Sequence, residues 1–255
     1  MGEVLVFDLT GPMAHFRKYY TNTSALTYGF PPRTALMGVV AAVLGFERDS
    51  YYEKLDRGRF AVAVKVPPRR LFQTVNYVRT KREDLPLLRR LQRLPGTQTP
   101  LEFLFPGGEY RALRFRVFFG HPDGGLVREA AARLKEGRPC FPLYLGLTEC
   151  LASASYVNLF GTRDYELLPP GTPVALTSVL NAAHLEKVDL PAVSAARLLR
   201  ERAPYAFGPG RTLRPPVAVV YEAGGQPLPV RLRVLAYRFS LATAGDGETV
   251  AFLEG

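Results

Sequence analysis

The chain has 255 residues, and because 47% of them are hydrophobic it can bury a sizeable core, which argues against disorder. Its 33 basic and 23 acidic residues give a net charge of +10 and a pI near 9.8, which favours a polyanionic partner, either nucleic acid or an anionic surface. The longest apolar run, residues 35–46, is shorter than the ~20 residues of a membrane-spanning helix, and the two cysteines lack metal-ligand spacing, so we expect a cytoplasmic protein without a membrane segment or a zinc site.

The beginning of the chain predicts a strand, a helix and a second strand. Residues 3–10 alternate between two faces, as a strand does, and a Gly-Pro pair ends them. Residues 33–44 are apolar nearly all round, which indicates a buried helix with Gly45 as its C-terminal stop. Residues 59–66 are rich in valine and predict a strand that two prolines terminate.

The loop between the first strand and the helix combines basic and aromatic side chains and contains no acidic residue. Basic side chains suit phosphates, aromatic rings suit unstacked bases, and the free N–H groups at the start of the helix favour an anion. The alternative is that the aromatic residues form the edge of the core. The RNA contacts predicted in this segment are His15, Phe16, Arg17, Lys18, Tyr19, Tyr20, Tyr28, Arg33 and Thr34.

A basic insertion follows the second strand. Nine basic and two acidic residues lie in residues 65–93, so this window carries +7 of the net charge of +10. Residues 71–79 and 101–105 predict the arms of a hairpin-like excursion, with a short helix over residues 85–94 between them. Long insertions between core strands are usually functional. The further candidate RNA ligands here are Arg79, Lys81 and Arg82.

The next segment predicts a strand over residues 111–119 and an amphipathic helix over residues 126–135. A turn at residues 145–147, a helical piece beginning at Thr148 and one more strand after Ser155 complete the order. This order matches the ferredoxin-like β-α-β-β-α-β pattern of RNA-recognition folds.

The predicted fold class is therefore α+β, in two parts. Residues 1–168 form a ferredoxin-like domain of the RRM type, interrupted by the basic insertion at about residues 67–106. Residues 169–255 form a smaller, strand-rich C-terminal domain, because proline and glycine recur there between short strand patterns. The strands expected in it are residues 174–180, 217–221, 230–239 and 250–253.

Three sequence blocks resemble CRISPR-associated family five, a branch of the RAMP superfamily. They are the N-terminal strand closed by Gly11-Pro12, the helix entry Phe30-Pro31-Pro32-Arg33-Thr34 and the block FPLYLGLTEC at residues 141–150. The resemblance covers roughly the first 160 residues. The order of the three blocks, together with the basic insertion between them, makes the combination specific.

The resemblance implies a subunit of the Cascade surveillance complex of type I CRISPR systems, which act in antiviral defence. Such a subunit binds the 5′ handle of the CRISPR RNA (crRNA) and caps the backbone filament, beside the family-seven backbone subunit and the family-eight large subunit. Whether it also contacts target DNA near the flanking motif stays open. The resemblance also identifies the insertion as the family's thumb and adds Leu145 and Gly146 to the candidate RNA-binding residues.

Catalysis is the remaining alternative. In one subtype, members of the family cut precursor RNA with a tyrosine and a neighbouring lysine-histidine pair, but this chain has no Lys-His dipeptide. His15 with Lys18 and a nearby tyrosine offers an acid-base cluster, so a metal-independent endoribonuclease that processes precursor crRNA stays as the second hypothesis, and a general RNA-binding module outside CRISPR as the third. We expect a non-catalytic RNA-binding subunit that uses neither a cofactor nor a metal, because the motifs for nucleotide cofactors, phosphate loops and metalloproteases are missing.

Overall fold

The computed structural model describes residues 2–21, 25–78, 81–94, 96–189, 197–241 and 247–255, and the structural statements below concern these ranges. Arg79, one of the predicted RNA ligands, lies outside them. No helix within these ranges is long and apolar enough to cross a membrane. The fold is α+β, as predicted, and strands predominate over helices.

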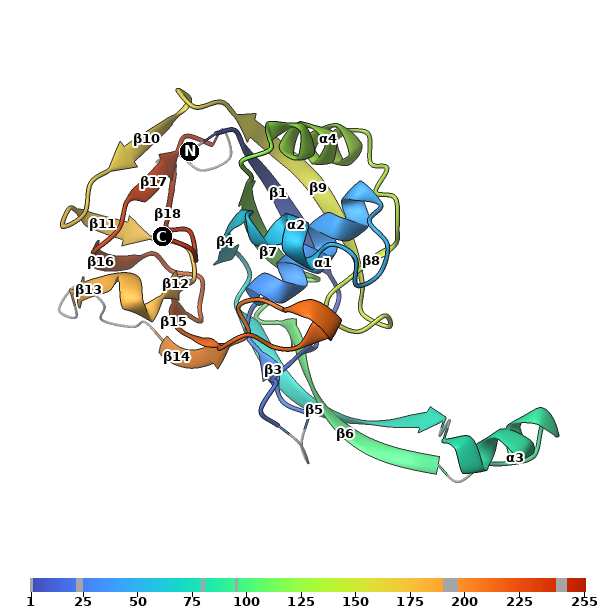
Figure 1. Cartoon of the computed structure of the whole chain (residues 1–255). Coiled ribbons are helices and arrows are strands. Elements are labelled where there is room, and N and C mark those ends of the chain that lie inside the picture. The colour runs from blue at the N-terminus through green and yellow to red at the C-terminus, as the bar shows by residue number, and fades with distance from the viewer. Residues whose placement is uncertain (1, 22–24, 79–80, 95, 190–196, 242–246) are drawn as a thin grey trace.

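An antiparallel sheet with the strand order β4-β7-β1-β9-β8 forms the centre of the molecule (Figure 1). The first predicted strand, β1, lies in its middle, because it pairs with both β7 and β9. Alternate side chains of β1 enter different cores: Leu5 and Leu9 join one, Val4 and Val6 the other. The strands of this sheet are β1 (Val4–Gly11), β4 (Arg59–Val64), β7 (Leu113–Gly120), β8 (Leu143–Tyr144) and β9 (Leu151–Phe160).

Helices α1 (Arg33–Leu44) and α4 (Gly124–Lys135) pack on one face of this sheet, where their apolar residues share a core with β1 and β7. Helix α1 has the predicted bounds, and Gly45 caps it with φ 80°, a left-handed conformation that glycine adopts without a Cβ clash. Asp123 caps the start of α4 through its side chain. A short helix, α2 (Tyr52–Asp56), follows α1.

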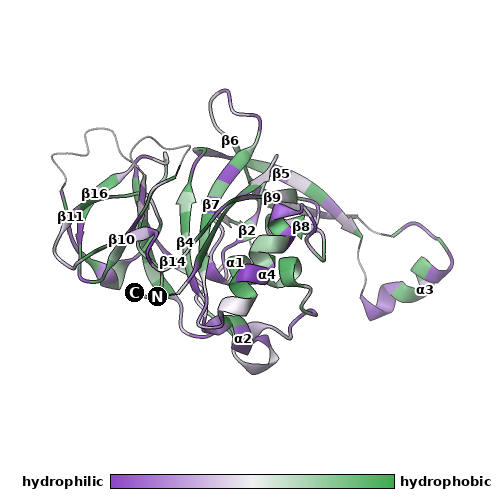
Figure 2. Ribbon diagram, turned by 90° about the horizontal axis from the view of Figure 1, so that it is seen from above, coloured by the Kyte–Doolittle hydropathy of each residue, from purple (hydrophilic) through white to green (hydrophobic). Residues whose placement is uncertain are grey.

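The predicted hairpin is present and projects from the body of the molecule (Figure 2). Its arms, β5 (Pro68–Val78) and β6 (Gly96–Pro106), pair over their whole lengths, and we call residues 68–106 the basic hairpin. A 3₁₀ turn (Arg82–Asp84) and helix α3 (Leu85–Arg89) lie at its tip. This helix ends earlier than predicted, and Leu91, just beyond it, has φ 53°, which a helix cannot contain.

The C-terminal part packs against the other face of the central sheet. Phe239 and Phe252 join Val4 and Phe118 in a second core. The backbone N–H of Val179 donates to the carbonyl of Val62 at 2.8 Å, which ties this part to β4.

The C-terminal part contains two sheets of its own. One sheet has the order β10-β17-β18-β11-β16-β13, with bounds Tyr165–Leu168, Ala236–Phe239, Glu248–Val250, Pro173–Leu176, Leu228–Leu232 and Leu185–Val188. Another has the order β12-β15-β14, with bounds Leu180–Asn181, Val217–Glu222 and Leu198–Ala203.

Other predicted elements also differ in the structure. The strand expected over residues 174–180 is divided into β11 and β12, and only residue 250 of the strand expected over residues 250–253 lies in β18. The helical piece expected at Thr148 does not form: Leu145 N–H donates to the Cys150 carbonyl, which closes a turn between β8 and β9, and β9 begins at once. The strand expected over residues 230–239 is divided, because the chain bends after Leu232 before β17 begins.

Candidate nucleic-acid interface

A groove of about 770 Å³ opens between α1, the first loop, the 141–147 block and a C-terminal segment, residues 204–213. Its charged lining residues are Arg17, Arg48, Arg211 and Glu47. Its exposed or half-buried rings are Tyr19, Phe46, Tyr51, Phe141, Tyr144 and Phe207. Positive charge beside accessible ring faces suits the phosphates and unstacked bases of single-stranded nucleic acid.

Part of the predicted RNA-binding set lies in this groove. Arg17, Tyr19, Thr34 and Gly146 line it, and none of these four is buried. Tyr20 lies beside Tyr19, with their ring centroids 5.1 Å apart in an edge-on arrangement, and it is 49% exposed. Residues predicted from the first loop and from the 141–150 block therefore meet at one surface.

Gly146 makes this meeting possible. Its φ is +93°, and a Cβ placed on it would lie 1.9 Å from the carbonyl oxygen of His15. The His15 N–H donates to the Leu145 carbonyl at 3.0 Å. Leu145 itself is buried in the core, so it shapes the groove from below and does not present its side chain to a ligand. A glycine is required here both by the backbone conformation and by the close approach of the first loop.

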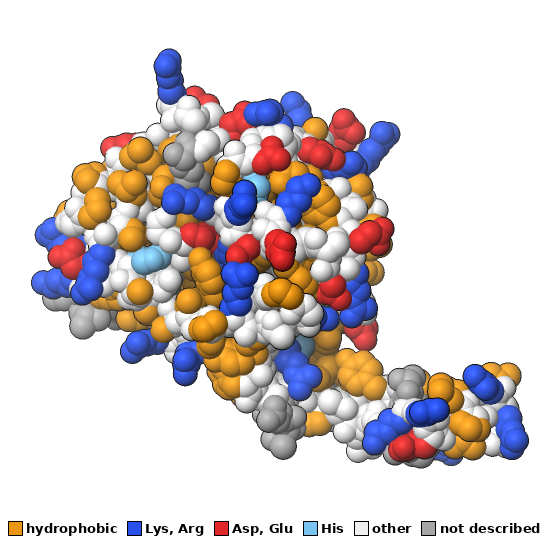
Figure 3. All heavy atoms as spheres, in the orientation of Figure 1, with side chains coloured by type: hydrophobic (Ala, Val, Ile, Leu, Met, Phe, Trp, Pro, Cys, Tyr) orange, Lys and Arg blue, Asp and Glu red, His pale blue; other side chains and the backbone are white. Residues whose placement is uncertain are grey.

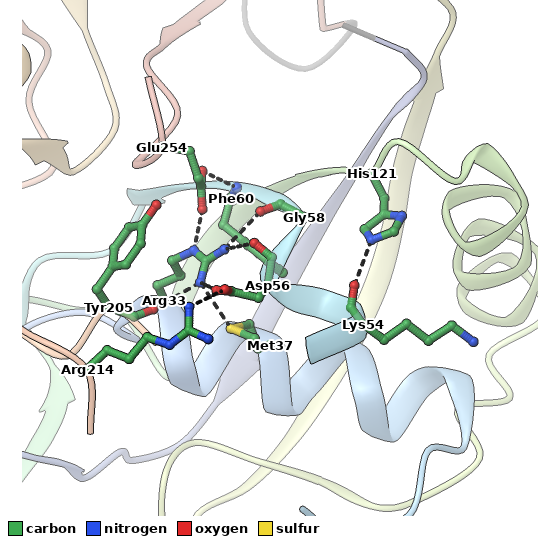
Figure 4. A network of polar contacts seen from close by, with 10 residues as sticks. All are labelled: Arg33, Met37, Lys54, Asp56, Gly58, Phe60, His121, Tyr205, Arg214 and Glu254. Atoms are coloured by element: carbon green, nitrogen blue, oxygen red, sulfur yellow. Dashed lines mark hydrogen bonds and ion pairs between the residues drawn. The ribbon is translucent and has the colours of Figure 1, made fainter. Parts of the chain in front are cut away.

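Arg33 requires a correction, because its side chain is in the core and only 2% exposed (Figure 4). It forms ion pairs with Glu254 and, at 2.9 Å, with Asp56, and it donates to the carbonyl of Tyr205 at 3.0 Å. A buried guanidinium is stable only when acceptors satisfy its donors, as they do here. Arg33 is therefore not available to a phosphate, and it instead fastens residues 204–214 to α1 and α2.

Four other predicted RNA ligands of the first loop are also buried: His15, Phe16, Lys18 and Tyr28. Phe16 and Tyr28 form the edge of the core, which was the alternative for these rings, and the Tyr28 hydroxyl donates to the Arg202 carbonyl at 2.6 Å. The His15 Nδ1 donates to the Glu102 carbonyl at 2.7 Å, and burial lowers the pKa of His15, so its ring is mostly neutral near pH 7. His15 and Phe16 also line the groove, but they are almost fully buried, so the accessible surface of the loop comes from Arg17, Tyr19 and Tyr20.

Lys18 belongs to an ionic cluster of Lys18, Arg70, Glu102 and Glu201, in which Lys18 and Glu102 are buried and Arg70 is exposed. Its Nζ lies 2.9 Å from Glu201, and Arg70 pairs with Glu201 at 3.3 Å and with Glu102 at 3.6 Å. Glu102 also accepts the backbone N–H of Thr27 at 2.9 Å. The cluster connects the first loop, the base of the basic hairpin and β14, so Lys18 neutralises carboxylates and is not free for RNA.

Most cations of the basic hairpin lie at its tip, away from the groove, whereas Arg69 and Arg70 lie at its base. Figure 3 shows Lys and Arg side chains gathered with hydrophobic ones at that end. Lys81 and Arg82 are exposed there, and Leu91 is 95% exposed. The structure thus separates the predicted ligands into a groove set and a hairpin set.

Several groove residues were not predicted from the sequence, among them Arg48, Tyr51, Tyr144, Phe207 and Arg211. Tyr144 had a signal, since it precedes the predicted pair at 145 and 146. The others had none, because a Gly-Pro-Gly-Arg turn and a short helix do not reveal which distant segment they face. The described residues contain no group of three or more His, Cys, Asp or Glu placed to hold a metal ion.

Comparison with known proteins identifies the family. Residues 4–198 match the family model described as "CRISPR-associated protein (Cas_Cas5)". The chain belongs to this Cas5 family, as the sequence predicted. No curated protein has a sequence that matches the chain. Residues 204–214, which form one wall of the groove, lie beyond the part that matches the Cas5 model.

One solved structure extends the likeness over nearly the whole chain. A CRISPR protein from Archaeoglobus fulgidus is 14% identical, with 98% of each chain covered and a TM-score of 0.57, which shows a shared fold. A chain of a CRISPR RNA-guided surveillance complex is 19% identical over 91% of each chain, with a TM-score of 0.48. A chain of a type III-B Cmr-beta complex is 10% identical, covers 89% of this chain and 86% of its own, and has a TM-score of 0.44.

Proposed function

We propose that this Cas5 protein is a non-catalytic subunit of a type I CRISPR surveillance complex and that its groove binds the 5′ handle of crRNA. The observation that carries the proposal is the composition of the groove, where Arg17, Arg48 and Arg211 surround partly exposed rings and face one acidic lining residue, Glu47. Phosphate contacts give affinity for a single strand, and ring faces accept its bases.

The architecture supports this proposal. We propose that residues 1–168 are a ferredoxin-like RNA-recognition domain and that residues 169–255 form the strand-rich domain beside it. The strand order β4-β7-β1-β9, with α1 and α4 on one face, is what a β-α-β-β-α-β chain with an insertion after its second strand gives.

The basic hairpin supports the assignment of the partners. We propose that it is the thumb, which contacts RNA where the handle passes to the family-seven backbone subunit, with the family-eight subunit near by. Its tip joins exposed cations, Lys81 and Arg82, to exposed apolar side chains such as Leu91. Such a mixture suits a surface that touches RNA and protein together.

The titratable groups of the groove favour binding over cleavage. Burial lowers the pKa of His15, and its Nδ1 is occupied by the Glu102 carbonyl, so it is a poor cationic stabiliser. Burial raises the pKa of Tyr51, so its hydroxyl stays protonated near pH 7 and is a poor general base. His121 is held by the Lys54 carbonyl at 3.0 Å, outside the groove.

The test is to incubate the purified protein with repeat RNA in EDTA and to measure binding by fluorescence anisotropy and cleavage on a denaturing gel. Binding that prefers handle RNA over a scrambled strand, without cleavage, is the expected result. Site-specific cleavage that disappears in His15→Ala would establish the endoribonuclease instead. Equal affinity for handle and scrambled RNA would leave a general RNA-binding module, and no binding to either would overturn the RNA role.

A further inference from the structure

One wall of the groove comes from a loop within the strand-rich part, residues 204–214, which we call the C-terminal loop. Pro204, Phe207, Arg211 and Leu213 of this loop line the groove. The opposite walls come from α1, the first loop and the 141–147 block, all of which precede residue 150. The groove is therefore incomplete without a segment that follows the part matched by the Cas5 model.

The C-terminal loop is closed by its own backbone. Phe207 and Leu213 form an antiparallel bridge, Gly208 N–H donates to the Thr212 carbonyl at 2.8 Å, and Arg214 N–H donates to the Ala206 carbonyl at 3.0 Å. These bonds hold the tip of the loop, the 3₁₀ turn Pro209–Arg211, in one conformation. A preorganised loop loses little entropy when a ligand binds.

The root of the loop is fastened to the helices by the buried guanidinium of Arg33 (Figure 4). Arg33 donates to the Tyr205 carbonyl at 3.0 Å and lies over the Tyr205 ring, 4.5 Å from its centroid. Arg214 pairs with Asp56 at 2.9 Å, and Asp56 also pairs with Arg33. The loop therefore has a fixed position relative to α1 and α2.

The tip of the loop brings one cation to a cluster of rings. The Arg211 guanidinium lies 5.9 Å from the centroid of Phe207, Phe207 lies 5.3 Å from Tyr52, and Tyr52 lies 4.7 Å from Tyr51. The Arg211 charge also reaches the Tyr51 hydroxyl, where it acts against the rise that burial causes in the pKa of Tyr51. Among the described residues Arg211 is exposed and forms no ion pair, in contrast to Arg33.

We propose that the C-terminal loop binds one nucleotide of the RNA, with its base against the half-buried rings of Tyr51 and Phe207, which line the groove, and its phosphate on Arg211. This inference rests on the proposed function, and it adds a nucleotide subsite built by the strand-rich part. The excess of arginine over acid around the groove selects an anion, and the rings select a flat group attached to it. The volume of about 770 Å³ is in the range of sites that enclose a small ligand.

The first experiment compares Arg211→Gly with the wild-type protein in RNA-binding titrations at several salt concentrations. Arg211 has φ 62°, a conformation that glycine adopts freely, so this variant removes the guanidinium without straining the loop. Loss of a charge-assisted phosphate contact is expected to weaken handle binding about tenfold and to flatten the salt slope by about 0.7. Arg163→Ala, in the exposed turn between β9 and β10, removes the same charge elsewhere and should leave both values unchanged.

The second experiment locates the base. RNA with 4-thiouridine at successive handle positions is irradiated with the full-length protein, and the crosslinked peptides are identified by mass spectrometry. One position should crosslink to a peptide that contains Tyr51 or Phe207, and this crosslink should weaken in Phe207→Leu.

The outcomes separate the inference from the proposed function. If the wild-type protein binds handle RNA and Arg211→Gly binds it equally well, or if crosslinks appear only in the first loop, the subsite is overturned while the handle-binding function stands. If the wild-type protein does not bind handle RNA, both are overturned.

Discussion

Arg33 is held in the core by acceptors from separate segments of the chain, and removing its charge should be costly. In Arg33→Met the side chain keeps most of its volume, but the buried Glu254 carboxylate loses its cation. Breaking a buried ion pair in this way typically costs about 3–5 kcal/mol, so the free energy of unfolding in urea should fall by that amount. Arg48→Met, at a residue whose side chain is 84% exposed, is the control and should change stability little. Equal stability of the two variants would contradict the structural role of Arg33.

Gly146 offers a second prediction at the scale of one residue. Gly146→Ala should destabilise the protein more than Gly137→Ala, because both glycines have positive φ but only Gly146 has an atom in the way, the His15 carbonyl oxygen at 1.9 Å. The left-handed backbone alone costs about 1–2 kcal/mol, and the forced backbone shift should add about 1–3 kcal/mol. Thermal unfolding measures the difference. Similar losses in both variants would mean that the first loop moves aside without cost.

Sequence reasoning could identify the residue types of the site but not their exposure. Arg17, Lys18 and Arg33 are equivalent as sequence, yet the first is exposed, the second pairs with Glu201 and the third is buried among carboxylates. Glu201, which pairs with Lys18, and Glu254, which pairs with Arg33, lie in the last quarter of the chain. A segment that contains no acidic residue can therefore still be paired in the folded chain with acidic residues from distant segments.

At the scale of elements, the basic hairpin should act separately from the body. Arg82→Ala and Lys81→Ala should each flatten the salt dependence of RNA binding by about 0.7 without lowering the unfolding temperature, because both side chains are exposed at the hairpin tip. Arg70→Ala is the contrast: it removes a member of the ionic cluster and should lower stability as well. Titrations from low to moderate salt, together with thermal melts, provide both readouts. An unchanged slope would remove the tip from the interface.

Local sequence patterns predicted an element well where its backbone hydrogen bonds are made within the element itself. Helix α1 has the predicted bounds, because a continuous apolar face and Gly45 define it, and the arms of the hairpin follow from their strand patterns. The turn at Thr148 was predicted as a helix, because the sequence does not reveal the bond from Leu145 N–H to the Cys150 carbonyl that bends the chain. Local propensity fails where a contact between neighbouring strands decides the conformation.

At the scale of the whole molecule, acid should weaken the fold. Burial lowers the pKa of both His15 and His184, so in the folded state these rings take up protons less readily than in the unfolded chain, where the pKa is near 6.5. The unfolded state then binds more protons below about pH 6.5, and stability should fall as the pH drops from 7 to 5.5. Urea midpoints measured across this range should decline less steeply in His15→Gln than in the wild-type protein. Parallel declines would assign the effect to other groups.

The groove could not be predicted as a whole, because its walls come from segments that the fold alone brings together. The first loop and the 141–150 block were singled out, but the C-terminal loop was not, since nothing in residues 204–214 indicates that Arg33 binds the Tyr205 carbonyl across most of the chain. The walls of the groove are far apart in the sequence, and ion pairs and backbone hydrogen bonds bring them together in the fold.

The ion pair between Arg33 and Glu254 also constrains the order of folding. These residues are 221 positions apart, whereas Arg33 and Asp56 are separated by 23, so the nearer contact can form early and the distant one must wait until a very long stretch of chain has been ordered. Until then the root of the C-terminal loop lacks its anchor. We therefore expect the groove to be among the last surfaces to form, so that a ligand that requires all of its walls would bind only to molecules that have finished folding.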